Sequence, residues 1–489
     1  MRQGVGIVWA VADHPWVEEQ GGAAVRVAMT VIANSPPQGT LVAVDEAAQK
    51  VREIVVPRIH ADLTAAADIA GAARDKLKAN AGISSRGFTL VGRGFVLDTV
   101  EGLQLRDLDI SHTPRVRPYL NGRDLSSRPR GVFVIDFGLG GEDVARQTPV
   151  LYDLVRTRVK PERDGNNRKT YRDHWWRFGE ARIELRNALA GLDRYIATPY
   201  VSKHHYMVIL DAEIAPDEKI VAIATSEGFV MGVLSSLIHA SWARAAGSRL
   251  GAGNDPTYNN SLCFDPFPFP TPAPDLRAKI DDVAERLDEH RKAALARDER
   301  VTMTGMYNVV EKLRSGEALT PKERYVHQIA ACGVLRDLHD ELDRLVAEAY
   351  GWPWPMECDE ILERLVALHD ERVEEERRGL VRWLRPEYQI PRFGRGGDAG
   401  PAAELALPDA EAAYPAPAER RPWPAGAVEQ ITAVKAQVAA ASATAEEAAA
   451  AFHGAPPALV RQYLDALVMA GEVRLDPDSG RFAPVAEPL

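Results

Sequence analysis

Residues 6–33, GIVWAVADHPWVEEQGGAAVRVAMTVIA, decide the fold class at the start of the chain. GIVWAVA is an apolar run and AAVRVAMTVIA alternates in polarity around Arg26, so each predicts a β-strand. The Gly-containing connection VEEQGGA predicts that the two strands form an antiparallel hairpin. An isolated hairpin is marginal in water, and no obvious partner strands follow it. We therefore expect a hairpin whose partner strands lie outside this chain, with an edge that favours aggregation or partner docking.

The sequence that follows the hairpin predicts a small mixed region. LVAVD (residues 41–45) is typical of a strand, residues 65–79 predict a helix, and FTLVGRGFVLD (residues 88–98) predicts a strand interrupted by glycines.

A basic block follows from Thr113 to His205. It holds 18 Lys/Arg against 11 Asp/Glu, a surplus of 18 − 11 = +7, whereas the whole chain has a net charge of 59 − 70 = −11. Chain-wide acidity concerns solubility, while a clustered basic segment is the footprint expected of phosphate binding. On charge alone, a solvated basic face without a partner fits equally well.

The densest basic stretch is VRTRVKPERDGNNRKTYRDHWWRFG, residues 155–179. Arg and Lys can contact phosphates, and Arg and Asn can read base edges. Trp175 and Trp176 could stack on bases, but we favour core anchors. In RYIATPYVSKHH (residues 194–205), His204 and His205 could bind a metal, but adjacent side chains of an extended segment point to opposite faces, which favours phosphate contact or plain surface. The candidate DNA-contacting residues are Arg123, Arg156, Arg158, Lys160, Arg163, Asn167, Arg168, Lys169, Arg172, Lys203, His204, Arg249, Asn254 and Tyr258.

Two loops resemble cofactor or catalytic motifs of methyltransferases. VFVIDFGLGGED (residues 132–143) places Gly138 to Gly141 after an apolar run, but Pro149 shortens the helix that should follow, so we favour a plain loop. GNDPTYNN (residues 253–260) resembles the Asn/Asp-Pro-Pro-Tyr motif of amino-methylating enzymes, except that Thr257 replaces the second proline. We assign no catalytic, cofactor-binding or metal-binding residue.

The C-terminal third predicts helices, a linker and a small tail. Apolar residues at helical spacing predict two to four amphipathic helices in residues 275–384. Residues 392–426 are rich in Pro, Gly and Ala and predict a linker. In the tail, Thr444 with Glu447 predicts a helix cap, residues 456–470 predict a second helix, and EVRLD with RFAPV predicts a hairpin. This pattern indicates a winged-helix-like module, and the single Arg461 on its second helix favours a packing role over groove reading.

Composition restricts the class of protein. Hydrophobic residues make up 46% and charged residues 26% of the 489 residues, which excludes fibrous and disordered classes. Cys263, Cys332 and Cys358 share no close spacing, so we expect neither a disulfide framework nor a four-ligand zinc site. The apolar stretch 229–246 is broken by His239 and Arg244, and the N-terminus does not resemble a signal peptide. We therefore expect a cytoplasmic protein without a membrane role.

Several stretches together resemble one family. Over residues 5 to about 390, in family order, the sequence resembles the C-terminal part of MmeI-like type IIG/IIL restriction-modification enzymes and of related adenine-specific DNA methyltransferases. The matching stretches are VADHPWVEEQGGAAVRVAM, YLNGRDLSSRPRGVFVIDFG, YDLVRTRVKPERDGNNRKTYRDHWW, RYIATPYVSKHH, FVMGVLSSLIHASWA, LGAGNDPTYNNSLCFDPFPFP, and MYNVVEKL through AYGWPW.

The resemblance implies an α+β multidomain chain. We expect the terminal strands of an α/β methyltransferase sheet and a connector in residues 1–110, a mixed α/β target recognition domain that binds double-stranded DNA in 111–271, a helical domain in 272–390, a linker in 391–426 and the winged-helix-like module in 427–489. The family's cofactor loop and catalytic motif lie upstream of the hairpin, and neither matches this sequence.

The sequence leaves three hypotheses open. The favoured one is the DNA-reading portion of an S-adenosylmethionine-dependent adenine-N6 DNA methyltransferase of a restriction-modification or phage-defence system, truncated or split, with a separate chain carrying the methyltransferase half and the cofactor. The second is a complete small methyltransferase that uses Gly138 to Gly141 and Asp255 to Tyr258. The third is a non-enzymatic DNA- or protein-binding interaction protein.

Overall fold

The computed structural model describes most of the chain, in two units that span residues 1–406 and 407–489. The described residues are 5–15, 26–34, 38–45, 50–61, 63–65, 67–250, 255–394, 421–424, 426–440, 443–453, 455–470, 472–476 and 481–484. Among them, no helix combines the length and apolarity needed to cross a membrane.

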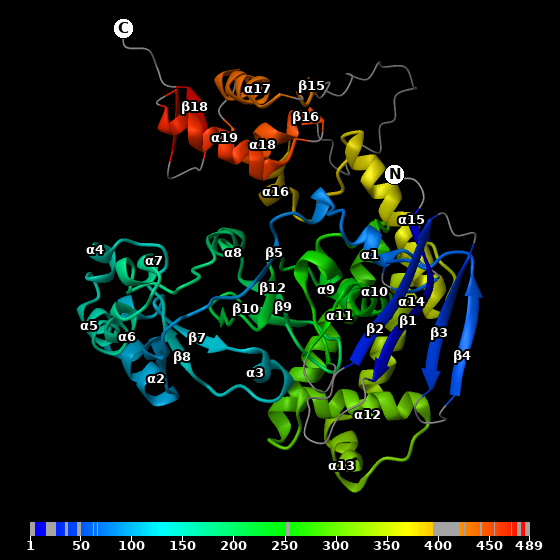
Figure 1. Ribbon diagram of the computed structural model, residues 1–489. Helices are drawn as coiled ribbons and strands as arrows, with labels where there is room; N and C mark the ends of the chain where they lie inside the picture. The colour runs from blue at the N-terminus through cyan, green and yellow to red at the C-terminus, as the bar shows by residue number, and fades with distance from the viewer. Residues whose placement is uncertain are drawn as a thin grey trace, which may run out of the picture. The chain divides into compact units, whose positions relative to one another are not determined.

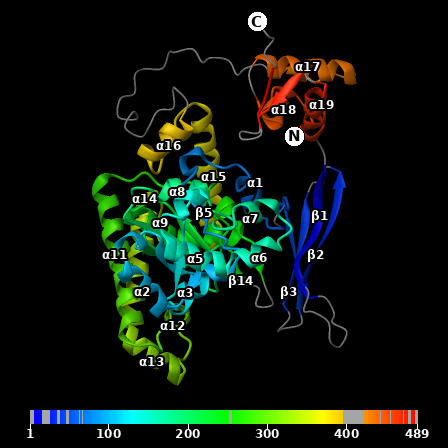
Figure 2. The same ribbon diagram turned by 90° about the vertical axis from the view of Figure 1, so that its left-hand side faces the viewer.

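The N-terminal strands form a four-stranded sheet in the order β2-β1-β3-β4. Its members are β1 (Val5–Pro15), β2 (Arg26–Asn34), β3 (Gly39–Asp45) and β4 (Lys50–Val56). The predicted antiparallel pairing of β1 with β2 is confirmed, and Figure 2 shows β1, β2 and β3 side by side. The expectation that the hairpin lacks partner strands in this chain is wrong. β3 pairs in parallel with the second edge of β1, and β4 pairs with β3, although the charged residues of KVREIVV hid β4 from the pattern analysis.

The helix predicted over residues 65–79 is wrong. The structure has one short turn, α1 (Ile69–Ala72), and a 3-10 turn at Lys78–Asn80. Long-range partners take the backbone N–H groups that a continuous helix would use. Leu77 N donates to Asp265 O over 3.1 Å, and Lys78 N and Ala79 N donate to the Glu376 carboxylate over 2.8 and 2.9 Å. The strand predicted over residues 88–98 reduces to β6 (Val96–Leu97) and two single bridges at Phe88 and Thr89.

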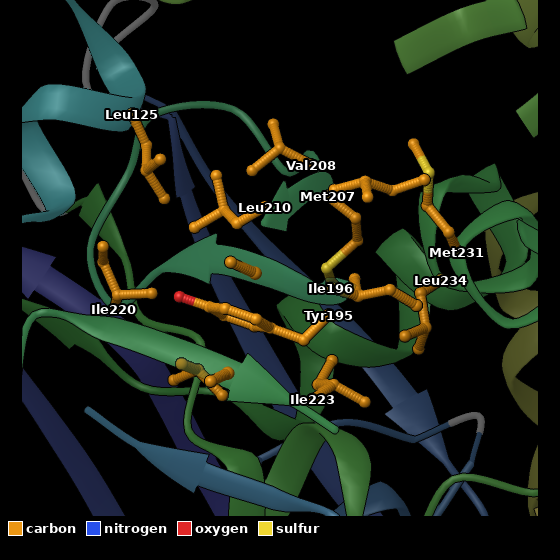
Figure 3. Packing of buried hydrophobic residues seen from close by; sticks show 14 of the residues in the cluster. Leu125, Tyr195, Ile196, Met207, Val208, Leu210, Ile220, Ile223, Met231 and Leu234 are labelled. Atoms are coloured by element: carbon orange, nitrogen blue, oxygen red, sulfur yellow. The ribbon is translucent and has the colours of Figure 1, made fainter. Parts of the chain in front are cut away.

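Two further four-stranded sheets form the centre of the first unit, in the orders β10-β9-β12-β5 and β11-β7-β8-β6. β9 lies between β10 and β12, and Figure 3 shows Tyr195 and Ile196 of β9 among Leu210, Ile220 and Ile223. The bounds of the strands in these two sheets, β6 aside, are β5 (Ser84–Arg86), β7 (Val116–Leu120), β8 (Phe133–Ile135), β9 (Arg194–Pro199), β10 (Val208–Asp211), β11 (Ala215–Pro216) and β12 (Ile220–Ile223). A separate two-stranded sheet is formed by β13 (Arg249–Leu250) and β14 (Asp255–Pro256).

Short helices connect these strands, and Figure 1 shows α4 to α7 gathered beside β7 and β8. They are α2 (Thr99–Leu108), α3 (Gly122–Ser126), α4 (Glu142–Ala145), α5 (Pro149–Arg158), α6 (Lys160–Asp164), α7 (Lys169–Asp173), α8 (Ile183–Leu189), α9 (Gly228–Ser235) and α10 (Leu237–Ala246), followed by a π-helical turn at Asn260–Phe264.

The apolar stretch at residues 229–246 forms two core helices. Every residue of α9 is buried, and Ser236 caps the start of α10. A helix that is apolar on all faces belongs in a core, which explains the run of hydrophobic residues. A Cβ on Gly232 would lie 2.7 Å from a side-chain carbon of Ile280, so this glycine permits the close packing of α9 against helix α11 (Pro274–Arg297).

The helical region holds five long helices between residues 274 and 377, more than the two to four predicted. They are α11 (Pro274–Arg297), α12 (Met303–Ser315), α13 (Pro321–Ala330), α14 (Cys332–Ala349) and α15 (Cys358–Arg377), followed by α16 (Pro386–Phe393). A single left-handed residue, Ala331, separates α13 from α14, so apolar spacing alone did not reveal the break. Most of the predicted linker lies outside the described residues.

The second unit contains the two predicted helices and the predicted hairpin in the predicted order, namely α18 (Ala445–Ala450), α19 (Pro457–Met469), β17 (Val473–Leu475) and β18 (Phe482–Pro484). It also contains one helix, α17 (Ala427–Ala440), and one strand pair, β15 (Arg421–Pro422) with β16 (Phe452–His453), that the sequence analysis did not predict. The predicted capping box of Thr444 with Glu447 and the antiparallel pair β17–β18 are confirmed. The winged-helix class itself stays a prediction.

Candidate nucleic-acid interface

Residues 155–179 fold into the end of α5, α6, α7 and the turns between them. Three of the candidate cations form ion pairs along their own helices: Arg156 with Asp153 at 3.0 Å, Lys160 with Asp164 at 2.7 Å and Lys169 with Asp173 at 3.1 Å. Exposed pairs of this kind contribute roughly 0–1 kcal/mol. A phosphate can therefore replace the carboxylate at little cost.

The turn between α6 and α7 presents Asn167, Arg168 and Arg172. Asn167 and Arg168 are exposed. Arg168 Nη1 donates to Tyr171 Oη over 2.7 Å, and its guanidinium lies 5.2 Å from the centre of that ring. Arg172 is half-buried and donates to Asn166 O over 2.5 Å, which stabilises the turn. This turn therefore exposes polar and cationic side chains on a backbone that a side-chain hydrogen bond stabilises.

Arg158 and Arg163 make structural contacts. Arg158 binds Glu101 of α2 through both terminal nitrogens, at 2.5 and 3.0 Å. Arg163 is only 1% exposed, and its Nη2 donates to Leu90 O over 2.7 Å and to Arg177 O over 3.0 Å. Burial lowers the pKa of Arg163. Because its guanidinium is enclosed and engaged, Arg163 holds the segment together and has almost no surface to offer to DNA.

The tryptophan pair lies in the core, as we favoured. Trp175 and Trp176 are buried, Trp175 packs against Tyr152, and Trp176 Nε1 donates to Gly140 O over 3.2 Å. The two rings therefore anchor the basic segment in the core, against α5 and the loop that follows β8.

Arg123 is an exposed cation at the start of α3. A capping box between Asn121 and Asp124 fixes the turn that presents it. Within the described part of the chain, its guanidinium has no hydrogen-bond or ion-pair partner. Arg123 is therefore free to contact an anion.

Lys203 and His204 lie against α12. Lys203 Nζ is 2.8 Å from Asn308 Oδ1 and 3.2 Å from Glu311 Oε2, and His204 Nε2 is 2.7 Å from the same Asn308 oxygen. Burial lowers the pKa of His204, which favours its neutral form. No group of three or more metal-ligating side chains occurs among the residues that the structure describes.

The segment that resembles a catalytic motif is only partly described. Tyr258 is buried, and its hydroxyl lies 3.0 Å from His239 Nε2 in a packed aromatic cluster. Arg249 forms a backbone bridge with Pro256, whereas the Arg249 side chain and Asn254 lie outside the described residues.

The glycine loop after β8 is organised by Asp136, a residue that the sequence analysis did not single out. Its buried carboxylate accepts from Arg117 Nη1 at 3.0 Å and from both terminal nitrogens of Arg186 at 2.8 Å. Burial alone would raise the pKa of Asp136, but the two guanidinium groups hold it below its usual range. Gly138 N also donates to Asp136, over 2.9 Å.

These contacts bear on whether the loop could hold a cofactor. Glycine loops that bind phosphates or other anions do so with free backbone N–H groups, whereas the N–H of Gly138 is already bonded to Asp136. Gly140 O in turn accepts from Trp176 and Arg177 of the basic segment. Two backbone groups of this loop are therefore already bonded within the protein, which favours the plain-loop interpretation.

Other residues missed from the sequence include Arg115 and Gln147, which line an open hollow of about 660 Å³ beside Asp136. Arg115 stacks over Phe137 at 5.8 Å, and no ion pair engages it among the described residues. The basic composition of residues 113–205 was a signal for Arg115, whereas nothing in the sequence marked Gln147.

Comparison with known proteins supports the family resemblance. A family model described as "MmeI, target recognition domain" matches residues 146–271. A solved structure of the type IIL restriction-modification enzyme MmeI in complex with DNA aligns with a TM-score of 0.58 and 17% identity over 76% of this chain. That alignment covers 46% of the MmeI chain, so this protein spans about half of its length. The type IIG restriction endonuclease BpuSI aligns with a TM-score of 0.27 and 10% identity over 71% of this chain and 44% of its own.

No curated protein sequence matches the chain. At 17% identity, the structural alignment establishes a shared fold. The match to the family model shows, in addition, that residues 146–271 carry the sequence pattern of the MmeI target recognition domain. The expected resemblance to the MmeI-like restriction-modification enzymes is therefore confirmed, with residues 146–271 corresponding to their target recognition domain.

Proposed function

We propose that residues 111–271 bind double-stranded DNA as the target-recognition portion of an S-adenosylmethionine-dependent adenine-N6 methyltransferase, in a cytoplasmic restriction-modification or phage-defence system. The observation that carries the proposal is the coincidence of two features. The stretch that matches the MmeI target recognition domain contains the basic segment 155–179, whose side chains at Asn167, Arg168 and Lys169 are exposed. Exposed cations on a hydrogen-bonded turn are suited to phosphate contacts, which position a protein on DNA.

The methyl-transfer chemistry belongs, in this proposal, to another polypeptide. Two observations support this division: the Gly138 N–H is already bonded to Asp136, and Tyr258 is packed in an aromatic cluster. The sheet β2-β1-β3-β4 supports a docking role because Val31, Ile32, Val51 and Val55 are all more than half exposed. Exposed apolar sheet surface of this kind marks interaction sites.

DNA binding by the purified full chain tests the proposal. Affinity for duplex DNA should fall with salt by about 0.9 log unit per log unit of salt for each phosphate contact. Replacing Arg123, Arg168 and Lys169 by Gln should lower the slope by up to about 3. A matched control replaces Lys279, Arg286 and Arg344, which are exposed on α11 and α14. An equal loss of DNA affinity in both variants would mean that only the net charge of the protein matters. The absence of any DNA affinity at low salt would refute the proposal.

Calorimetry with S-adenosylmethionine tests whether this chain binds DNA while another polypeptide binds the cofactor. We expect no heat of binding from this chain alone, and binding to appear when a methyltransferase half is added. Clear binding by the isolated chain would instead support a complete small methyltransferase.

A second candidate is a non-enzymatic interaction protein, and the exposed apolar side chains of β2 and β4 favour it. Selection from a random duplex library separates the two functions. Enrichment of one sequence supports target recognition, whereas a protein complex that persists without DNA, together with no enrichment, supports the interaction protein.

A further inference from the structure

The segment from Lys203 to Ile209 carries two candidate DNA-contacting side chains and leads into β10. One oxygen, Asn308 Oδ1, holds both of them, at 2.8 Å from Lys203 Nζ and 2.7 Å from His204 Nε2. Asn308 lies on α12, in the helical region and outside the stretch that matches the target recognition domain. The orientation of both side chains therefore depends on a helix from another part of the fold.

The backbone of the same segment is held by α11. β10 is the end strand of its sheet, so one of its edges has no neighbouring strand among the described residues. Arg291 Nη2 donates to Met207 O over 2.6 Å, and Asp288 Oδ1 accepts from Ile209 N over 3.2 Å. Both side chains are buried and bind each other at 3.1 Å. This pair supplies the hydrogen bonds that a further strand would have made.

Tyr307 joins the two sets of contacts. Its ring stacks on Tyr206 at 5.6 Å and on His204 at 5.9 Å between ring centres. Its hydroxyl accepts from Arg291 Nη1 over 3.0 Å and lies 2.9 Å from His339 Nε2 of α14. Residues 203–209 thus rest on α11, α12 and α14 through one connected network.

We infer that Asn308 is a positioning residue for DNA recognition, which makes α12 part of the recognition unit. The inference rests on the proposed function, because it assumes that Lys203 and His204 face DNA. Lys203 reaches Glu311 only through an exposed pair at 3.2 Å, so a phosphate can take the place of that carboxylate. Asn308 would keep the ammonium group in place during this exchange and so reduce the entropy lost on binding.

A double-mutant cycle in DNA affinity tests the inference. We expect Lys203→Ala combined with His204→Ala to weaken binding about tenfold and Asn308→Ala alone about threefold, as order-of-magnitude values for lost phosphate contacts. Adding Asn308→Ala to the combined variant should cause no further loss. Gln328→Ala removes an exposed amide on α13 and serves as the matched control, with no expected change. Thermal melts of each variant establish that it is folded.

The outcomes separate this inference from the proposed function. If Asn308→Ala weakens binding equally with and without Lys203 and His204, its role is merely structural and the inference is wrong. If the Arg123, Arg168 and Lys169 variant binds less well but Asn308→Ala binds normally, the inference fails and the proposed function stands. If none of the variants changes DNA affinity, both fail.

Discussion

Asp136 illustrates how one buried residue can determine local order. Its side chain is 3% exposed and is enclosed by two guanidinium groups and the Gly138 amide. Replacing it by Asn should lower the free energy of unfolding by about 3 kcal/mol, the lower end for a broken buried ion pair, because two half-buried arginines would lose their counter-charge. Urea denaturation measures this change. Asp173→Asn, which breaks an exposed pair with Lys169, is the control and should change stability by less than about 1 kcal/mol.

Asp343 makes stability depend on pH. Burial raises the pKa of its carboxyl to about 7. In the unfolded chain an Asp ionises near pH 4, so between about pH 4 and 7 the folded state holds the extra proton. Stability should therefore fall as the pH rises through this window, by up to about 1.4 kcal/mol per pH unit, and level off above it.

Asp343→Asn isolates this contribution. The Asn side-chain oxygen can still accept the hydrogen bond from Leu237 N, which Asp343 receives over 2.6 Å. The difference in unfolding free energy between wild type and variant should change steadily from pH 4 to 7. Parallel curves for the two proteins would contradict the assignment.

At the scale of elements, the helix cap at Thr444 offers a direct test. Its hydroxyl accepts from Glu447 N over 3.3 Å, and the Glu447 carboxylate accepts from Thr444 N over 3.1 Å. Thr444→Ala should destabilise α18 by about 1 kcal/mol. Hydrogen exchange within residues 427–484 is the suitable measurement, because a chain of two units need not unfold in one transition. Unchanged protection in α18 would contradict the prediction, and exchange in the first unit should not change.

Elements differed in how well local sequence predicted them. α19 and the β17–β18 hairpin follow from local periodicity and a turn, so they were predicted correctly. The helix expected at residues 65–79 failed because the carboxylate of Glu376 and the carbonyl of Asp265 bind its backbone from far along the chain. Tertiary contacts of this kind override the intrinsic helix propensity of a segment, and they cannot be read from a short window of neighbouring residues.

At the scale of the whole molecule, the N-terminal sheet should govern self-association. Val51 and Val55 of β4 are 65% and 61% exposed, and they lie on the same face of an edge strand. Replacing both by Lys should reduce self-association of the isolated chain, since charge on an edge strand opposes pairing with other strands. Sedimentation velocity over a concentration series measures this. Val334→Lys, at an exposed position on α14, is the control, and DNA affinity should not decrease in either protein.

The candidate interface was predictable from the sequence only in part. Clustered charge pointed to residues 155–179, and the structure exposes Arg168 and Lys169 there. The same pattern could not distinguish Arg163, which is enclosed by backbone carbonyls, from its exposed neighbours. Three residues were missed because their roles depend on side chains that lie far away in the sequence: Arg115, Asp136 and Asn308.

The sequence by itself determined the family resemblance, the β1–β2 hairpin, the capped tail helix and the basic segment, because motifs, periodicity and charge are local properties of the chain. Only the tertiary structure decided that β3 and β4 complete the N-terminal sheet, that α11 pairs the free edge of β10, and that α12 holds Lys203 and His204. Apart from the pairing of β4 with β3, these features depend on contacts between residues roughly 30 to 105 positions apart. Such contacts form only when packing brings distant backbone groups and side chains within hydrogen-bonding distance.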